Sequence, residues 1–122
     1  MKLGIVGSRR RNSLEDKKLI WRQLLLRLPD MIISGGCKRG ADRFAEELAE
    51  ELKIPITIFN PEFHLFPNTR YGKIEAYYAR NRKIAEVSDY LIALVAPDRK
   101  GGTENTIKYF RQARFYMNLK IL

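Results

Sequence analysis

Short apolar runs alternate along this chain with longer segments of helical periodicity. The short runs have the length and composition of β-strands, and they cover residues 2–6, 31–34, 55–59, 89–95 and 119–122. The longer segments carry an apolar residue at every third or fourth position, and they cover residues 13–28, 41–52, 73–88 and a last stretch through 107–117. This alternation predicts an α/β fold, a three-layer sandwich around a five-stranded parallel sheet, and we expect the strand order 3-2-1-4-5.

The helical segment 13–28 begins with Ser13 and Asp16, which approximate a capping box. Its predicted inner stripe consists of Leu14, Leu19, Ile20, Leu24 and Leu28. Trp21 and Leu25 widen this apolar surface, and we expect both side chains to be buried in the core. If both were exposed instead, they would mark a subunit contact.

A polar residue interrupts the inner stripe of the segment 73–88. The stripe consists of Ile74, Tyr77, Asn81, Ile84 and Val87. A buried amide needs hydrogen-bond partners, so Asn81 either holds a neighbouring loop or points into a ligand site, beside Arg80. The long connection 60–72 is typical of a lid or a packed surface loop. It holds His64, the only histidine, for which no metal or catalytic role is expected because the sequence offers no second His, no nearby Cys and no obvious acid partner.

The stretch 31–42 joins a strand to a helix through a glycine turn. The candidate ligand contacts in this turn are Ser34, Gly35, Gly36 and Lys38. Paired glycines let backbone N–H groups face a ligand, and the helix start adds partial positive charge, so the turn is a candidate anion site. The alternative is that the glycines only relieve backbone strain. Asp42 also has two open roles, stabilisation of the first helical turn and direct ligand contact.

Two more turns follow predicted strands, and neither matches a dinucleotide or P-loop fingerprint. One comprises Gly7, Ser8 and Arg9 and continues into two further arginines. The other comprises Gly101, Gly102, Thr103 and Asn105, and its helix start is a second candidate anion site. The arginine run is either a solvated loop or a ligand contact, and we favour contact through Ser8 and Arg9. The expected strand order brings all three turns to one edge of the sheet.

Length and charge limit the remaining possibilities. The chain has 122 residues, 45% of them hydrophobic, which predicts one domain over residues 1–122. Twenty-three Lys and Arg against 14 Asp and Glu leave a charge of +9, which favours a nucleotide, another phosphorylated small molecule or a nucleic acid as partner. The lone Cys37 predicts no disulfide, no metal centre and a reducing, cytoplasmic location. No apolar run approaches the roughly 20 residues of a membrane span, so no membrane association is expected.

Four motifs occur in order along most of the chain. They are Gly7-Ser8-Arg9, Ser34-Gly35-Gly36 with Gly40-Ala41-Asp42, Arg80-Asn81, and Gly102-Thr103-Glu104-Asn105-Thr106. Together they resemble the SLOG superfamily, and in particular its small YspA/YpsA-like proteins. The superfamily includes Lonely Guy phosphoribohydrolases, molybdenum-cofactor carrier proteins and the Rossmann domain of DNA-processing protein A. The resemblance implies a Rossmann-like domain that binds a nucleotide or nucleotide-derived ligand with these loops. We expect no cofactor other than a possible bound nucleotide.

The resemblance also indicates which of the possible functions we expect first. Its phosphoribohydrolases carry a catalytic glutamate where this chain has Thr106, and their catalytic arginine aligns with Arg80, which is the one candidate catalytic residue. We therefore expect binding or sensing of a phosphorylated nucleoside, with a phosphoribohydrolase-like enzyme and a nucleic-acid binder as alternatives. Related proteins are often dimers. Here the aromatic residues of the last helix predict self-association, and they are Tyr109, Phe115 and Tyr116.

In the binding hypothesis, each group of residues contacts a different part of the ligand. The backbone N–H groups of Gly35, Gly36 and residues 101–103 hold the phosphate. The positive charge comes from Arg9, Lys38 and Arg80. The sugar or base is contacted by Ser8, Asp42 and Asn81.

Overall fold

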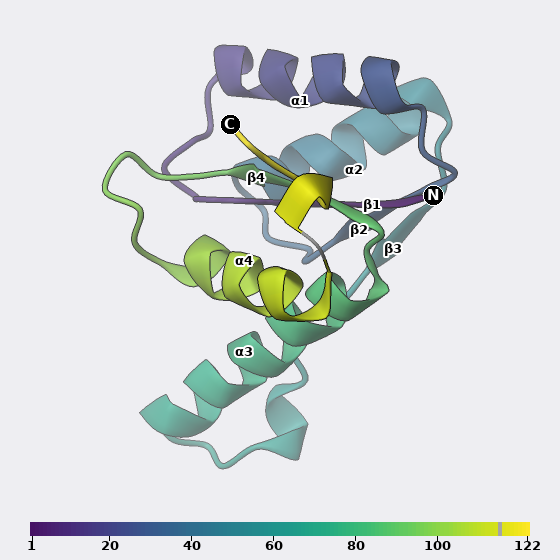
Figure 1. Cartoon of the computed structure of the whole chain (residues 1–122). Helices are drawn as coiled ribbons and strands as arrows, with labels where there is room; N and C mark the ends of the chain where they lie inside the picture. The colour runs from purple at the N-terminus through teal and green to yellow at the C-terminus, as the bar shows by residue number, and fades with distance from the viewer. Residues whose placement is uncertain (115) are drawn as a thin grey trace.

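A five-stranded parallel sheet forms the middle layer of the computed structural model, which describes residues 1–114 and 116–122 (Figure 1). The strand order is β3-β2-β1-β4-β5, as predicted. The strands are β1 (Lys2–Gly7), β2 (Met31–Ser34), β3 (Ile56–Ile58), β4 (Tyr90–Leu94) and β5 (Leu119–Ile121). Every pairing is parallel, so the carboxyl ends of the strands lie along one edge of the sheet.

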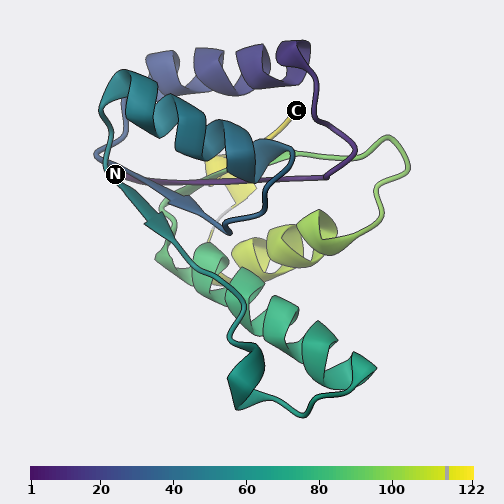
Figure 2. The same cartoon turned by 180° about the vertical axis from the view of Figure 1, so that it is seen from behind.

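Two helices cover each face of the sheet, which confirms the three-layer α/β fold. The helices are α1 (Leu14–Arg27), α2 (Ala41–Leu52), α3 (Arg70–Val87) and α4 (Gly102–Ala113), with short 3₁₀ helices η1 (Phe63–Leu65) and η2 (Tyr116–Asn118). In both views α1 and α2 lie on one side of the sheet, and α3 and α4 lie on the other (Figures 1 and 2). No helix in the described part of the chain is long and apolar enough to cross a membrane.

Successive residues of the central strands point to opposite faces of the sheet, so each strand supplies both apolar layers. Leu3 and Ile5 of β1 pack with Phe44 of α2 in the layer under α1 and α2. Val6 packs with Phe110 of α4 in the layer against α3 and α4. Burial on both faces explains why these strands read as nearly continuous apolar runs.

The start of α1 follows the prediction, but its outer surface does not. The Ser13 hydroxyl accepts a hydrogen bond from the Asp16 N–H, and the Asp16 carboxylate accepts one from the Ser13 N–H, so the capping box is confirmed. The expected burial of Trp21 and Leu25 is wrong, because these side chains are 41% and 44% exposed. Two members of the predicted inner stripe, Leu14 and Leu28, are also exposed.

Helix α3 begins at Arg70, three residues earlier than expected, because Thr69 caps it. The Thr69 hydroxyl accepts a hydrogen bond from the Gly72 N–H at 3.0 Å. The first half of α3 extends beyond the sheet together with η1, as Figures 1 and 2 show. The position of this half matters for function because it forms one wall of the cleft described below.

We expect Gly72→Ala to destabilise the protein, because an added Cβ would lie 1.8 Å from the Pro67 carbonyl oxygen. The overpacking predicts a loss of about 1–3 kcal/mol in the free energy of unfolding, measured by urea denaturation. Gly102→Ala is the matched control, since the nearest heavy atom to its added Cβ is 3.8 Å away. Equal urea midpoints for the two variants would contradict the close packing at Gly72.

Candidate ligand-binding cleft

A cleft of about 610 Å³ opens where the β1–α1 and β2–α2 turns meet α3 and the start of α4. Ten of the predicted site residues line it: Gly7, Ser8, Arg9, Gly35, Asp42, Arg80, Asn81, Gly101, Gly102 and Thr103. Four predicted residues do not line it: Ser34, Gly36, Lys38 and Asn105. The strand order therefore brings together three turns that are far apart in the sequence.

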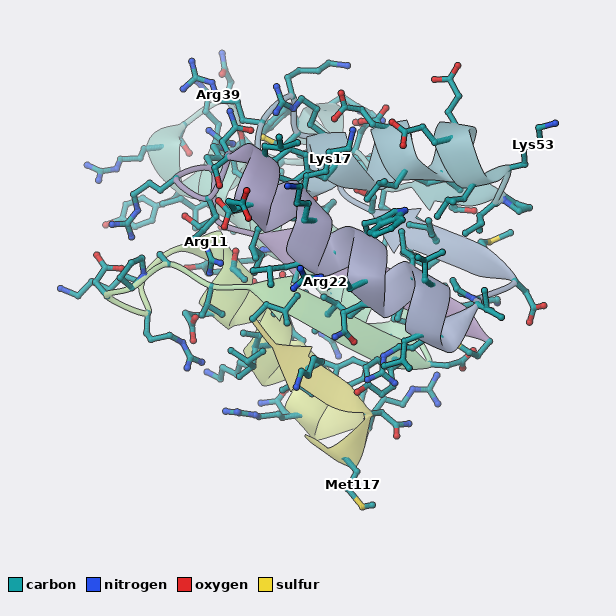
Figure 3. All side chains as sticks on the ribbon, turned by 90° about the horizontal axis from the view of Figure 1, so that it is seen from above. Arg11, Lys17, Arg22, Arg39, Lys53 and Met117 are labelled. Carbon is teal, nitrogen blue, oxygen red and sulfur yellow. The ribbon has the colours of Figure 1, made fainter. Side chains whose placement is uncertain are left out.

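The three consecutive arginines of the β1–α1 turn have different environments. Arg11 is structural, because its guanidinium donates to the Asp16 carboxylate at 2.9 Å and to the Leu122 carbonyl at 2.9 Å. Arg10 lines the cleft and donates to the Asp98 carboxylate at 2.6 Å, which links the β1–α1 turn to the β4–α4 connection. The Arg11 side chain lies at the carboxyl end of the sheet in Figure 3.

Arg9 is the arginine of this run that faces the α3 wall of the cleft. A charge interaction with the Cys37 side chain raises the pKa of Arg9, partial burial opposes this effect, and the Tyr77 hydroxyl adds to it by hydrogen bonding and charge. All three side chains line the cleft. Arg9 therefore keeps its positive charge next to the space that a ligand would occupy.

The β2–α2 turn is occupied by a carboxylate of the protein itself. The Cys37 N–H donates to Oδ2 of Asp42 at 3.0 Å. Burial raises the pKa of Asp42, and the Cys37 N–H and the Arg80 charge only partly offset this effect. A Cβ at Gly35 would lie 2.7 Å from Nη1 of Arg80 and 3.0 Å from Oδ2 of Asp42. The glycine thus makes room for both charged groups at the base of the cleft.

The other three predicted contacts of this turn do not line the cleft. Gly36 has a φ of +75°, and an added Cβ would lie 2.6 Å from Oδ1 of Asn60 and 2.8 Å from Cγ2 of Ile58. Lys38 is exposed to solvent. Ser34 is fully buried, and its hydroxyl has no hydrogen-bond partner among the described residues.

Arg80 and Asn81 join α3 to two of the turns. Nη1 of Arg80 donates to the Gly35 carbonyl at 2.6 Å, and its Nε donates to the Asn81 amide oxygen at 2.9 Å. The Asn81 amide donates to Oδ1 of Asn105 at 3.0 Å, and Gly102 O lies 3.4 Å away. Burial lowers the pKa of Arg80 despite the opposing charge of Asp42. Asn81 therefore holds the start of α4, which is the first of its two predicted roles, and it also lines the cleft, where ligand contact stays a prediction.

The N-cap residues of α2 and α4 are both glycines without a side-chain cap, and the start of α4 differs from the β2–α2 turn because no carboxylate like that of Asp42 accepts from its N–H groups. Gly101 has a φ of +114°, and an added Cβ would meet no heavy atom within 4 Å. Glu104 is turned toward Arg99, whose guanidinium donates two hydrogen bonds of 2.9 Å to its carboxylate. The backbone N–H groups at the start of this helix are free of side-chain acceptors within the described chain, and they lie beside Lys100 in the cleft.

The first half of α3 supplies an apolar wall that the sequence did not reveal. Ile74, Tyr77 and Tyr78 line the cleft. The Tyr77 ring is fixed by an edge-to-face contact with Phe63 at 5.3 Å, and the Arg80 guanidinium lies 5.6 Å from its centre. The sequence feature that could have indicated this wall is the pair of adjacent tyrosines four and three positions before Asn81.

Other lining residues were also missed as ligand contacts, including Arg10, Cys37, Lys100 and Thr106. The described residues contain no group of three His, Cys, Asp or Glu side chains that could hold a metal ion. His64 lies in η1 and does not line the cleft. Comparisons with known protein families, with curated proteins and with solved structures find no match to this chain.

The raised pKa of Asp42 predicts that its charge lowers the stability of the folded protein at neutral pH. Asp42→Asn keeps an oxygen that can accept from Cys37, so we expect a Tm at pH 7.5 equal to or above that of the unsubstituted protein. The destabilisation by the Asp42 charge is present above the raised pKa of Asp42 in the folded protein. It disappears as the pH falls below the unfolded pKa of about 3.9, so the difference in Tm between Asp42→Asn and the unsubstituted protein shrinks.

Asp98→Asn is the control with the opposite sign, because hydrogen bonding from Arg10 lowers the pKa of Asp98. Its ionised form stabilises the fold above the unfolded pKa, so this variant should melt slightly lower at pH 7.5 and lose that deficit in acid. A Tm several degrees below the unsubstituted protein for Asp42→Asn at pH 7.5 would show that the Asp42 charge is needed for folding.

Proposed function

We propose that this cleft binds or senses a nucleotide or a nucleotide-derived phosphorylated ligand. The observation that carries the proposal is the uncapped start of α4, which lies in the same cleft as Arg9, Lys100 and a tyrosine wall. Free N–H groups and the positive end of a helix dipole favour phosphate, and aromatic side chains favour a flat base. This proposal includes membership of the SLOG superfamily, which the four motifs suggest.

The two glycine turns have different roles in this proposal. The β2–α2 turn already satisfies its Cys37 N–H with the Asp42 carboxylate, and a second anion there would be repelled by that charge. The phosphate therefore lies on Gly102 and Thr103, with Lys100 and Arg9 supplying positive charge.

The sugar and the base follow from the remaining lining residues. A carboxylate accepts hydrogen bonds, so Asp42 suits the hydroxyl groups of a sugar, and the cleft-lining Asn81 amide lies between it and the phosphate end. Ile74, Tyr77 and Tyr78 provide the apolar surface on which a base can stack. Each part of a nucleoside phosphate thus meets a group of matching chemistry.

A nucleic acid is a weaker fit than a single nucleotide. Two cationic side chains at this edge are already paired with acids, Arg10 with Asp98 and Arg99 with Glu104. These pairs reduce the positive charge outside the cleft that a polynucleotide backbone would need.

Calorimetric titration with a panel of nucleoside monophosphates tests the binding proposal. We expect measurable binding at millimolar ligand or below, and weaker binding of the matching nucleosides because they lack the phosphate. Lys100→Ala should weaken binding by about tenfold, the loss of one charge-assisted contact, and Gly102→Val should weaken it further by occupying the phosphate position. Lys38→Ala is the matched control, because Lys38 lies on the same edge but outside the cleft. An absence of binding at millimolar ligand, or equal losses for the two lysine variants, would refute the proposal.

A phosphoribohydrolase-like reaction is the second candidate, because the cleft contains the carboxylate of Asp42 beside the guanidinium of Arg80. Thr106 stands at the family's glutamate position, and its hydroxyl donates to the Gly102 carbonyl at 3.3 Å. In hydrolysis, water attacks the anomeric carbon as the bond to the base breaks, and Asp42 is the lining carboxylate that can take the proton of that water.

Chromatographic detection of free base from nucleoside monophosphates tests this second candidate. If the enzyme turns over, we expect Asp42→Asn and Arg80→Ala to abolish base release, because each removes a charged group at the reacting centre. Lys38→Ala should leave the rate unchanged. Saturable nucleotide binding without any base release would leave the binding proposal in place and reject the enzyme.

A further inference from the structure

A second cavity of about 400 Å³ lies where η1, the segment 66–69 and the start of α3 meet. This is the part of the molecule that extends beyond the sheet (Figures 1 and 2). The residues that line it are Phe63, His64, Phe66, Pro67, Asn68 and Lys73. The volume is in the range of cavities that bind small molecules.

This cavity is separate from the other surfaces for which we expect a ligand or a partner. It shares no lining residue with the cleft. It also belongs to a different part of the chain from the last helix, whose aromatic residues predict self-association. Of these, Tyr109 packs against the core beside Phe110, Phe115 lies outside the described residues, and the side chain of Tyr116 is likewise not described. Self-association through that helix stays a prediction.

Hydrogen bonds and close packing hold the backbone around the second cavity in place. The Phe66 N–H donates to the Phe63 carbonyl at 3.1 Å, which closes the turn of η1. The Thr69 N–H donates to the Pro67 carbonyl at 2.8 Å, and Gly72 packs closely against that same carbonyl. A cavity whose walls are already ordered loses less conformational entropy when a ligand binds.

The walls of the second cavity are mainly aromatic. They are supplied by Phe63, Phe66 and Pro67. Phe63 is 46% exposed although its ring contacts Tyr77 at 5.3 Å, so part of its surface is open to a ligand. Aromatic rings pair favourably in offset-stacked or edge-to-face geometry. These walls therefore suit a ligand that contains an aromatic ring.

The charge next to these rings is positive. Lys73 is exposed, and its ammonium forms no ion pair with any residue that the structure describes. Glu62 precedes η1 but does not line the cavity, and its carboxylate accepts from Lys83 at 2.5 Å. This hydrogen bond is the main reason why the pKa of Glu62 is lowered, and the charge of His64 contributes least. Lys73 is therefore available to an anionic ligand.

The other charges at the start of α3 do not neutralise Lys73. At about 100° per residue, Glu75 projects about 200° away from Lys73 on the helix, whereas Arg70 projects only about 60° away. The Gly72 N–H is already bonded to the Thr69 hydroxyl at 3.0 Å, so the helix start is capped. One ammonium beside a capped helix start matches a single carboxylate better than it matches a phosphate of higher charge.

We propose that this second cavity binds a small aromatic carboxylic acid. The ring of the ligand packs against Phe63 and Phe66, and its carboxylate accepts from the Lys73 ammonium, with the Asn68 amide as a further donor. Phe63 lies between this cavity and Tyr77 of the cleft wall. The proposal does not depend on what the cleft binds, because the two sites share no lining residue.

An NMR titration of the ¹⁵N-labelled full chain with 3-phenylpropionate tests this proposal. We expect saturable binding at millimolar concentrations, with the amide shifts concentrated in residues 63–73. The alcohol 3-phenylpropanol keeps the ring without the carboxylate and should bind about tenfold more weakly. Acetate keeps the carboxylate without the ring and should bind more weakly still. No binding, equal binding of 3-phenylpropionate and either control compound, or shifts concentrated at Gly102 and Thr103 would overturn the proposal.

A matched pair of lysine variants tests the charged contact. Lys73→Ala should weaken binding of 3-phenylpropionate by about tenfold, the loss of one charge-assisted contact. Lys108→Ala should leave binding unchanged, because Lys108 is an exposed lysine that lines neither cavity. Lys100→Ala, which should weaken nucleotide binding, should also leave it unchanged, so failure of one proposal is distinguishable from failure of the other. Equal effects of Lys73→Ala and Lys108→Ala would overturn the proposal.

A second matched pair tests the aromatic wall. Phe66→Ala should weaken binding of 3-phenylpropionate by about fivefold, because the ring of the ligand loses one aromatic partner. Leu65→Ala should leave binding unchanged, because Leu65 is 64% exposed and does not line the cavity. Equal binding by the two variants would likewise contradict the proposed site.

Discussion

The hydrogen bond from the Cys37 N–H to the Asp42 carboxylate determines how the carboxyl edge of this sheet can be used. It fills the β2–α2 turn with a negative charge that belongs to the protein. Arg80 lies against the same turn and donates to the Gly35 carbonyl. In the proposed binding mode, this charge excludes an incoming phosphate from one glycine turn, and the phosphate lies instead at the uncapped start of α4.

Helix α3 gives this edge its shape. Its residues Arg80 and Asn81 connect to Gly35 on one side and to Asn105 of α4 on the other, so the two turns keep a fixed separation. About one turn earlier in the same helix, Tyr77 and Tyr78 line the cleft, and the first half of α3 extends beyond the sheet. Helix α3 thus supplies both the hydrogen-bonding side chains of Arg80 and Asn81 and the aromatic rings of Tyr77 and Tyr78 to the same cleft.

The sequence predicted the strand order and the meeting of the three turns because both depend on the periodicity of the whole chain. It could not tell the two glycine turns apart, since that difference depends on where one carboxylate points. Gly36 looked like a ligand contact, yet its missing side chain is explained by the close approach of Ile58 and Asn60. We expected Trp21 in the core because apolar character alone does not distinguish the buried side of a helix from an exposed side.

The most direct test of this account is an NMR titration of the ¹⁵N-labelled protein with a nucleoside monophosphate, followed at the backbone amides of both turns. The account predicts that the Gly102 and Thr103 signals shift with the largest amplitude, and that the Cys37 amide, already bonded to Asp42, shifts little. Phosphate-dependent shifts concentrated at Gly35, Gly36 and Cys37, with none at Gly102 and Thr103, would contradict it.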